Sequence, residues 1–197
     1  MAADTIGHGS MNPHRFESHN KDFLIDDERV SEQPAEEIIS RADINMGDIV
    51  ADLGCGNGYF AIPLTEMAYR VLALDVSHEM LDDLLDRAND AQREKLRPIQ
   101  CELPELPLRT SGVDHVLMVN VLHEIGDKKV MAKEIMRVLS EGGTVSIVDF
   151  QKRPTKRGPP LEERIDESDI PKLFPDLILK ERHSFASYYQ FEFVKSL

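Results

Sequence analysis

The sequence predicts an α/β fold in which a mostly parallel, doubly wound sheet carries helices on both faces. Short runs rich in β-branched residues alternate with stretches whose apolar residues recur at helical spacing. A turn of alternating glycines joins the first such run to a helix, as in strand–turn–helix units that bind nucleotides. Because 197 residues suffice for one well-buried core and are few for two, we expect a single domain.

The expected helices begin at residues suited to that place. Pro34 lies in the first turn of one helix, whereas Ser77 and Asp127 cap two others. Pro63 is tolerated because it falls in the opening turn of the helix after the glycines. The expected elements are helices at residues 34–42, 59–68, 77–89, 127–139 and 168–174, and strands at residues 49–53, 70–75, 99–102, 113–119, 144–150, 177–185 and 188–194, with Gly142 and Gly143 ending the connection before the fifth strand.

Composition and charge exclude several classes of protein. The formal net charge of −13 argues against long-range attraction to nucleic acid, whose binding depends on neutralising phosphates. No apolar run is long enough to cross a bilayer, and residues 1–10 lack the segments of a secretory signal. The two cysteines, Cys55 and Cys101, indicate neither a disulfide framework nor a zinc site. We therefore expect a cytoplasmic protein with no membrane span and no bound metal.

The glycine turn is the candidate ligand site. Gly54, Gly56 and Gly58 permit positive φ and let backbone amides approach a ligand closely. The dinucleotide pattern G-x-G-x-x-G/A fits only as Gly56, Gly58 and Ala61, which leaves Asp52 near an anionic pyrophosphate. Asp52 would repel that ligand but suits a cation, such as the sulfonium or ammonium of S-adenosylmethionine. An ordinary Gly-rich loop is the alternative on these residues alone.

A family resemblance supports the cation-binding interpretation. Residues 52–58, D-L-G-C-G-N-G, resemble the D-x-G-x-G-x-G motif of class I S-adenosylmethionine-dependent methyltransferases. Further stretches agree with that family in order and spacing, namely residues 74–77 with Met80 and Leu81, residues 101–108, residues 119–125 and residues 137–143. The resemblance is to the UbiE-like type that methylates small molecules. It implies a Rossmann-like sheet of seven strands with an antiparallel last strand, S-adenosyl-L-methionine as cofactor and S-adenosyl-L-homocysteine as product.

Specific residues are expected to hold that cofactor. Asp75 ends the second strand about 20 residues after the first glycine, where a carboxylate accepts hydrogen bonds from both ribose hydroxyls; a purely capping role is the alternative. The resemblance implies that Glu102 accepts from the adenine amino group and that the backbone near Leu103 meets the ring edge. Asn120 is expected to line the methionine part through its backbone. The full expected set is Asp52, Gly54, Gly56, Gly58, Asp75, Val76, Glu102, Leu103 and Asn120.

His123 is the candidate catalytic residue. The carboxyl end of the fourth strand delivers Asn120 and His123 to the edge where open α/β sheets bind ligands. The unperturbed pKa of a histidine suits proton abstraction near neutrality, and a histidine with no base role is the alternative. The implied reaction is an in-line displacement of methyl from sulfonium, for which alignment and a dry pocket supply much of the acceleration.

The sequence favours a small molecule as methyl acceptor. Residues 120–123 read N-V-L-H, whereas methyltransferases acting on exocyclic amines of bases or on amides carry N/D-P-P-Y/F there. Cys55 lies in the glycine turn, which argues against the set of thiols that arsenite methylation requires. Two other functions stay open: a cofactor-binding regulatory or partner subunit without turnover, and an NAD-dependent enzyme, which Asp52 disfavours.

Two flanking segments have alternative interpretations. Residues 1–30 are a polar leader ahead of a methyltransferase domain at residues 31–197. The resemblance implies that this leader forms part of a lid over the substrate side. The alternative is that residues 14–16 and 23–25 pin it to the body of the protein as a tail. Residues 152–160 are basic and proline-rich, and they follow the carboxyl end of a strand. They are expected to hold an anionic substrate or to act as a lid, and a solvated linker is the alternative.

Overall fold

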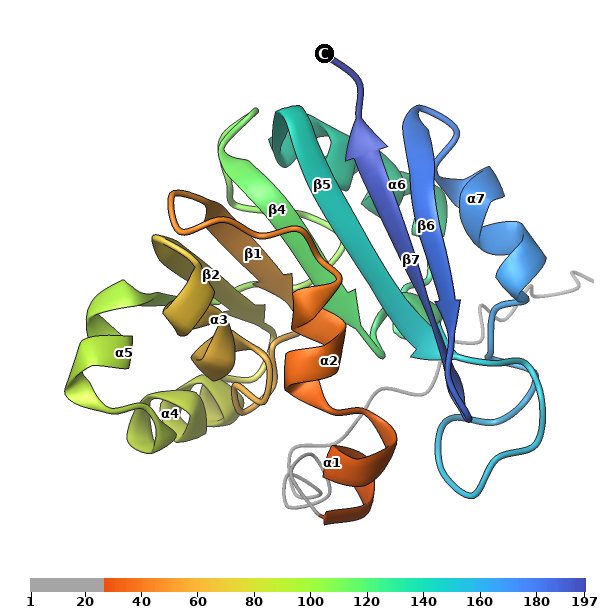
Figure 1. Ribbon diagram of the computed structural model, residues 1–197, viewed down its shortest axis with the longest axis horizontal. Helices are drawn as coiled ribbons and strands as arrows, with labels where there is room; N and C mark the ends of the chain where they lie inside the picture. The colour runs from red at the N-terminus through yellow and green to blue at the C-terminus, as the bar shows by residue number, and fades with distance from the viewer. Residues whose placement is uncertain (1–26) are drawn as a thin grey trace, which may run out of the picture.

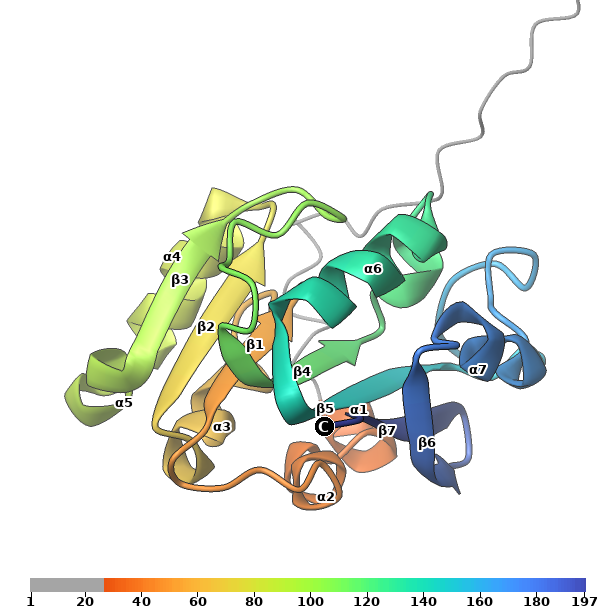
Figure 2. The ribbon, with the colours of Figure 1, turned by 90° about the horizontal axis from the view of Figure 1, so that it is seen from above.

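One sheet organises the molecule, and its strands are β1 (Ile49–Leu53), β2 (Arg70–Asp75), β3 (Leu96–Gln100), β4 (Val113–Val119), β5 (Leu139–Phe150), β6 (Leu177–Ser184) and β7 (Tyr188–Lys195). The computed structural model describes residues 27–197, so the expected anchors at residues 14–16 and 23–25 lie outside the described residues. Within this range the seven strands follow the order β3-β2-β1-β4-β5-β7-β6 (Figures 1 and 2). β1 to β5 pair in parallel, and β7 is antiparallel to both β5 and β6.

Helices cover both faces of the sheet. They are α1 (Asp27–Glu32), α2 (Ala35–Ser40), α3 (Ala61–Met67), α4 (His78–Arg87), α5 (Asp90–Lys95), α6 (Lys128–Val138) and α7 (Ile170–Leu173), with short 3-10 helices η2 (Leu122–Glu124) and η3 (Glu167–Asp169). One apolar cluster joins α6 and α7 to the sheet, and a second joins α2, α3 and α4 to it. Figure 2 shows α6 on the opposite side of the sheet from α2 and α3. Burial of these apolar faces is the main stabilising term of such a layered fold.

The expected fold class is confirmed. The sheet is Rossmann-like, mostly parallel and seven-stranded, and its last strand in the chain is antiparallel. β7 lies between β5 and β6, so the chain places its final strand inside the sheet rather than at the edge. β1 and β4 are neighbours, and the elements that follow them, α3 and α6, lie on opposite faces. This is the switch point at which open α/β sheets bind ligands.

Several element boundaries differ from those expected. β3 runs from Leu96 to Gln100 rather than over residues 99–102, because an edge strand tolerates Pro98. Glu102 therefore lies beyond the strand. β5 begins at Leu139 and includes the two glycines that were expected to precede it, and an irregularity in its pairing with β4 accommodates them. The expected helix at residues 77–89 ends at Arg87.

Two smaller helical features were also misjudged from the sequence. Asn89 and Gln92 form a reciprocal capping box that begins α5, a helix that the apolar pattern did not predict because none of its residues is buried. The sequence predicts a helix at residues 168–174 that Pro171 breaks. The structure instead has η3 followed directly by α7, and Pro171 lies in the first turn of α7, where a missing N–H costs nothing.

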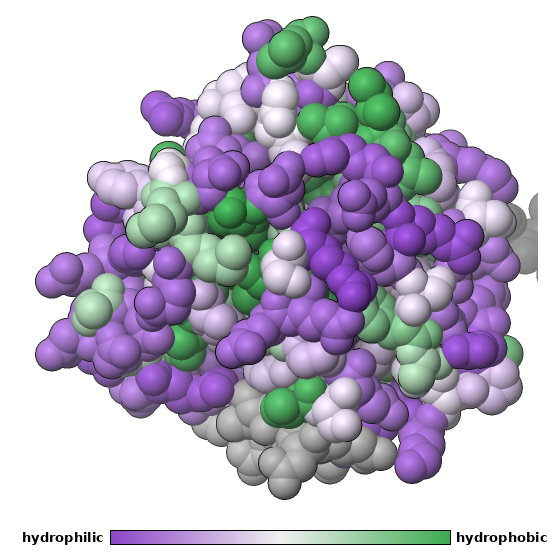
Figure 3. Space-filling view, viewed as in Figure 1, coloured by the Kyte–Doolittle hydropathy of each residue, from purple (hydrophilic) through white to green (hydrophobic). Residues whose placement is uncertain are grey.

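The surface is mostly hydrophilic on the face seen in Figure 3, with hydrophobic groups scattered over it. Charged residues make up 30% of the sequence, which accounts for that appearance. Within residues 27–197, each helix is too short or too polar to cross a bilayer.

Candidate functional site

The glycine turn leaves the end of β1 in a conformation that requires glycine. The φ angles of Gly54, Gly56 and Gly58 are 72°, 53° and 83°. The backbone N–H groups of Gly54 and Cys55 donate to the carbonyl of Leu74 at 2.8 and 2.9 Å, which fixes the turn against β2. A Cβ at Gly54 would lie 2.4 Å from a methyl carbon of Val121. The segment after β4 therefore packs directly on the turn after β1.

Two carboxylates make this turn electronegative. Asp52 is 2% exposed near the end of β1, and Asp75 ends β2. Burial, and then the charges of Asp52 and Asp75, raise the pKa of the Cys55 thiol between them. Because the same field would repel a pyrophosphate and attract a cation, the residues present fit S-adenosylmethionine better than a dinucleotide.

Asp75 has a structural role besides the expected one. Its Oδ2 accepts from the N–H of Gly56 at 2.8 Å, and its Oδ1 accepts from the N–H of Ser77 at 2.9 Å. Each carboxylate oxygen has a second lone pair, so both remain able to accept from the hydroxyls of a ribose. Asp75 thereby fixes the local backbone, and its contact with a ribose stays a prediction.

Asn120 follows β4 in a left-handed conformation, with φ of 58°. Its side-chain Nδ2 donates to Oε1 of Gln33 at 2.9 Å, and Nε2 of Gln33 donates to Oδ1 of Asn120 at 3.3 Å. Gln33, between α1 and α2, is 1% exposed. The two residues are 87 positions apart, and no local sequence pattern could have paired them.

The expected adenine contacts lie in residues 101–112, which connect β3 to β4 without a helix. Glu102 is exposed and Leu103 is half-buried. The guanidinium of Arg137 on α6 donates to the carbonyls of Leu106 and Leu108 at 2.9 and 2.7 Å, which holds the loop. Arg137 thereby acquires a role that the sequence did not suggest.

His123 lies in η2 and is 5% exposed. Its Nδ1 lies 2.7 Å from Oδ1 of Asp149, and its backbone N–H donates to Oδ2 at 3.1 Å. Because a carboxylate only accepts hydrogen bonds, neutral His123 carries its proton on Nδ1 and its lone pair on Nε2. Burial opposes the charged imidazolium, but the Asp149 charge and hydrogen bond outweigh it and raise the pKa of His123.

Hydrogen bonds to the backbone fix both members of the His123–Asp149 pair. The N–H of Phe150 donates to Oδ1 of Asp149 at 2.8 Å, and Asp149 is 1% exposed. Lys128 donates to the carbonyls of Ile125 and His123 at 2.7 and 3.4 Å, which fixes the turn of η2. Such an arrangement orients the imidazole before any ligand binds.

Residues 152–160 are anchored by a buried cation. Arg164 is 5% exposed, and its guanidinium lies over the ring of Phe150, with 5.2 Å between the guanidinium carbon and the ring centroid. Its donors reach four backbone carbonyls at 2.7 to 3.1 Å, those of Gln151, Arg153, Arg157 and Pro159. The loop is thus a fixed wall beside Asp149 and Phe150.

The carboxyl ends of β1, β2 and β4 bring together most of the predicted site residues: Asp52, Gly54, Gly56, Gly58, Asp75, Asn120 and His123. Val76 is 38% exposed and its backbone carbonyl accepts from Nε2 of Gln100, and its expected contact with the cofactor stays a prediction. Asp149 was missed, although the rule that led to His123 also applies to the end of β5. Among residues 27–197 no group of three or more His, Cys, Asp or Glu side chains is placed to hold a metal ion.

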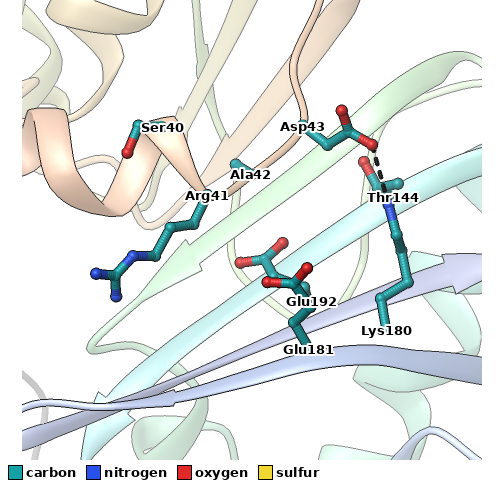
Figure 4. Close-up of a pocket in the computed structure, with 8 residues that line it drawn as sticks. All are labelled: Ser40, Arg41, Ala42, Asp43, Thr144, Lys180, Glu181 and Glu192. Atoms are coloured by element: carbon teal, nitrogen blue, oxygen red, sulfur yellow. Dashed lines mark hydrogen bonds and ion pairs between the residues drawn. The ribbon is translucent and has the colours of Figure 1, made fainter.

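A separate pocket lies toward the amino ends of the parallel strands, and its volume is about 370 Å³. Figure 4 shows Glu181 and Glu192 reaching from β6 and β7 toward the end of α2, with the Lys180–Asp43 ion pair beside them at 2.9 Å. Because ligands of open α/β sheets bind at the other end of the strands, this pocket is distinct from the candidate site.

Comparison with known proteins finds one matching family and several similar methyltransferases. The sequence model of the family described as "Methyltransferase domain" matches residues 51–147. Demethylmenaquinone methyltransferase of Oceanobacillus iheyensis is 28% identical over 123 residues, which cover 61% of this chain and 51% of that protein. The chloroplastic 2-phytyl-1,4-beta-naphthoquinone methyltransferase of Arabidopsis thaliana is 33% identical over 126 residues, covering 58% and 46%. The chain therefore spans about half the length of the curated relatives it matches.

Solved structures share the fold. A SAM-dependent methyltransferase from Aquifex aeolicus superposes with a TM-score of 0.83 at 22% identity, over 91% of this chain and 99% of that one. An S-adenosylmethionine-dependent methyltransferase from Mesorhizobium loti gives 0.71 at 17% identity, over 83% and 99%.

Proposed function

We propose that the chain, whose residues 51–147 match the methyltransferase-domain family, is a class I S-adenosylmethionine-dependent methyltransferase that methylates a small-molecule acceptor. S-adenosylmethionine is the cofactor of this family. One observation carries the proposal: an electronegative glycine turn and a buried His123–Asp149 pair lie at the carboxyl ends of adjacent strands.

The proposed chemistry assigns separate tasks to the two parts of the site. When bound, S-adenosylmethionine supplies an activated methyl group on a sulfonium. Asp75 accepts from the ribose, and the carboxylate of Asp52 favours the positive charge. Nε2 of His123 takes the proton that the acceptor loses, and Asp149 keeps the ring in the required tautomer and stabilises the imidazolium that forms.

The same pair favours turnover over a regulatory subunit. A subunit that only binds cofactor has no use for a buried histidine whose orientation and pKa are set by a carboxylate. Methyl transfer to an acceptor is the measurement that decides between the two functions.

The acceptor proposed for the first tests is a reduced quinone. The two relatives described above are named for methylation of demethylmenaquinone and of 2-phytyl-1,4-beta-naphthoquinone, and another is a ubiquinone/menaquinone biosynthesis C-methyltransferase of Xylella fastidiosa. A hydroquinol has an acidic hydroxyl whose proton suits a histidine base. The acidic chain and the absence of the N/D-P-P-Y/F motif support a small acceptor over a nucleic acid.

The test is incubation of the protein with methyl-labelled S-adenosylmethionine, with and without reduced naphthoquinones or a metabolite extract. We expect acceptor-dependent label transfer and S-adenosylhomocysteine release, both lost in His123→Ala and kept in His78→Ala, which alters an exposed histidine on α4. Cofactor binding with no labelled product from any acceptor would favour the regulatory subunit. Tight binding of NAD in calorimetry would instead revive the dinucleotide interpretation.

A further inference from the structure

The pocket toward the amino ends of the parallel strands has a buried, acidic floor. Its volume of about 370 Å³ lies in the range of sites for small molecules. Glu192 on β7, which is 4% exposed, and the half-buried Thr144 on β5 form this floor. Glu181 on β6 is exposed and lies at the rim, and Figure 4 shows both glutamate side chains reaching toward the end of α2. A ligand of the pocket therefore meets two carboxylates.

Two cations also line the pocket, and both already have anionic partners. Lys180 pairs with Asp43 at 2.9 Å, and Arg41 pairs with Glu37 at 2.6 Å. An anionic ligand would have to displace one of these carboxylates before it could bind a cation of the pocket. The pairing therefore disfavours an anion and leaves the carboxylates of β6 and β7 to attract a positive charge.

Within residues 27–197 the carboxylate of Glu192 has neutral hydrogen-bond partners and no ion pair. It accepts from the hydroxyl of Ser146 and from Nε2 of Gln190, each at 2.7 Å. Gln190 lies two residues before Glu192, hence on the same face of β7, and is fully buried. Its Oε1 has no hydrogen-bond donor among the described residues. Acceptors thus outnumber donors around the floor of the pocket, where a buried acceptor without a donor is costly.

A primary ammonium group supplies what this floor lacks, because it carries a positive charge and three N–H donors on one atom. A metal ion is a poorer match, since among residues 27–197 no group of three or more His, Cys, Asp or Glu side chains is placed to hold one. We propose that the pocket is a second ligand site, separate from the candidate active site, which binds the primary ammonium group of a small amine through Glu192 and Glu181.

Binding at this site is coupled to the ionisation of Glu192. Burial raises the pKa of Glu192 from 4.5 to about 7, and the charge of Lys180 opposes this shift while that of Glu181 adds to it. The other titratable groups that face it are Arg41 and Asp43 from the end of α2, His183, which pairs with Glu181, and His115 from β4 behind Ser146. Because an ammonium prefers the ionised carboxylate, its affinity should rise roughly tenfold between pH 6 and 8.

The test is a titration with n-butylammonium chloride in about 0.15 M NaCl, which screens diffuse attraction to the acidic chain. Backbone amide chemical shifts report the affinity and also locate the site. We expect saturable shifts at residues 40–43, 144, 180–181 and 192. At pH 8 the affinity should fall roughly tenfold in Glu192→Gln, which keeps the size of the side chain, and stay unchanged in Glu105→Gln, an exposed change between β3 and β4.

A second ligand separates hydrogen bonding from charge alone. Tetramethylammonium has the same charge and no N–H donor, so it should bind roughly tenfold more weakly than butylammonium. Equal affinities of the two ions would indicate diffuse attraction and would overturn the proposal. So would shifts that lie outside the pocket, or an affinity of Glu192→Gln equal to that of the wild type.

The dependence on pH distinguishes a ligand-binding Glu192 from a merely structural one. The affinity for butylammonium should rise with pH in the wild type and stay constant in Glu192→Gln, and a constant affinity in the wild type contradicts the proposal. If Glu192→Gln fails to fold, the exposed change Glu181→Gln must weaken butylammonium binding for the proposal to stand. None of these measurements involves S-adenosylmethionine, so their outcome is independent of the proposed function.

Discussion

His123 presents a lone pair on Nε2 only while Asp149 holds the proton on Nδ1. In the proposed reaction the base form is lost as the pH falls through the raised pKa of His123, so activity should decline on the acid side at a pH above the ordinary value of 6.5. Two residues distant in sequence thus set one property of the site.

Asp149→Asn should move that acid limb to lower pH, because the largest of the charges that raise the pKa of His123 is gone and those of Glu124 and Glu163 remain. The maximal rate should fall by roughly 100-fold or more, since the imidazolium formed during proton transfer loses its carboxylate. The measurement is a pH–rate profile of kcat, with the exposed Asp176→Asn as control. An acid limb that stays in place would remove Asp149 from the proposed mechanism.

Asp75→Ala should weaken the binding of S-adenosylhomocysteine by about tenfold or more, because the ribose hydroxyls lose their acceptor. The N–H groups of Gly56 and Ser77 lose theirs too, so the free energy of unfolding should fall by about 1 kcal/mol. Calorimetric titration well below the melting temperature separates the two effects. Affinity equal to that of Asp82→Ala, a change on the exposed side of α4, would contradict the ribose assignment.

At the scale of elements, the apolar periodicity of the sequence predicted the strands and helices that are set by buried packing. It missed the features that are set by single polar side chains. β2 and β4 were placed residue for residue, since each is a buried run bounded by turn residues. α5 escaped because it buries nothing and is defined by the Asn89–Gln92 capping box. The roles of Arg137 and Arg164 could not be predicted, because their partners are backbone carbonyls of loops that only the folded chain brings within reach.

The loop at residues 152–160 depends on Arg164, and Arg164→Met should release it. A buried guanidinium bound to several carbonyls contributes about 2 kcal/mol, so the free energy of unfolding should fall by that order. Amide exchange over residues 151–164 should accelerate, and the KM for the acceptor should rise more than that for the cofactor. Arg97→Met, on the edge strand β3, is the control. Unchanged exchange would show that the loop is held by something other than Arg164.

At the scale of the whole molecule, a buried polar chain links β4, β5 and β7 across the sheet. The hydroxyl of Thr144 lies 2.7 Å from Nδ1 of His115, whose Nε2 lies 3.2 Å from the hydroxyl of Ser146. Ser146 in turn donates to Glu192 at 2.7 Å. Burial lowers the pKa of His115 from 6.5 to about 3 and raises the pKa of Glu192 from 4.5 to about 7.

These two shifts act on stability with opposite signs. Between pH 3 and 6.5 the unfolded chain binds a proton on His115 that the native state refuses, so stability rises with pH. Between pH 4.5 and 7 native Glu192 keeps a proton that the unfolded chain releases, so stability falls as pH rises. The two contributions to stability oppose one another between pH 4.5 and 6.5, where the ranges overlap. Between pH 6.5 and 7 only the loss of stability from Glu192 remains.

Glu192→Gln should therefore stabilise the protein at pH 8, by up to about 3 kcal/mol, and change little near pH 4.5. A glutamine amide can still donate to Ser146 and accept from Gln190, so the chain of hydrogen bonds survives with its direction reversed. Urea unfolding at a series of pH values checks this, with the exposed Glu105→Gln as control. Equal stability of wild type and Glu192→Gln at pH 8 would show that native Glu192 ionises there at no cost.

The place of β7 between β5 and β6 also bears on how the sheet is completed during synthesis. β6 leaves the ribosome before β7, yet its ladder partner is β7, and until that strand emerges β5 presents an open edge of unsatisfied amides and carbonyls. Vectorial folding can assemble the parallel strands early, but β5 and β6 gain their common partner only when β7 emerges. The nascent chain is most exposed to wrong pairing and chaperone capture in this interval.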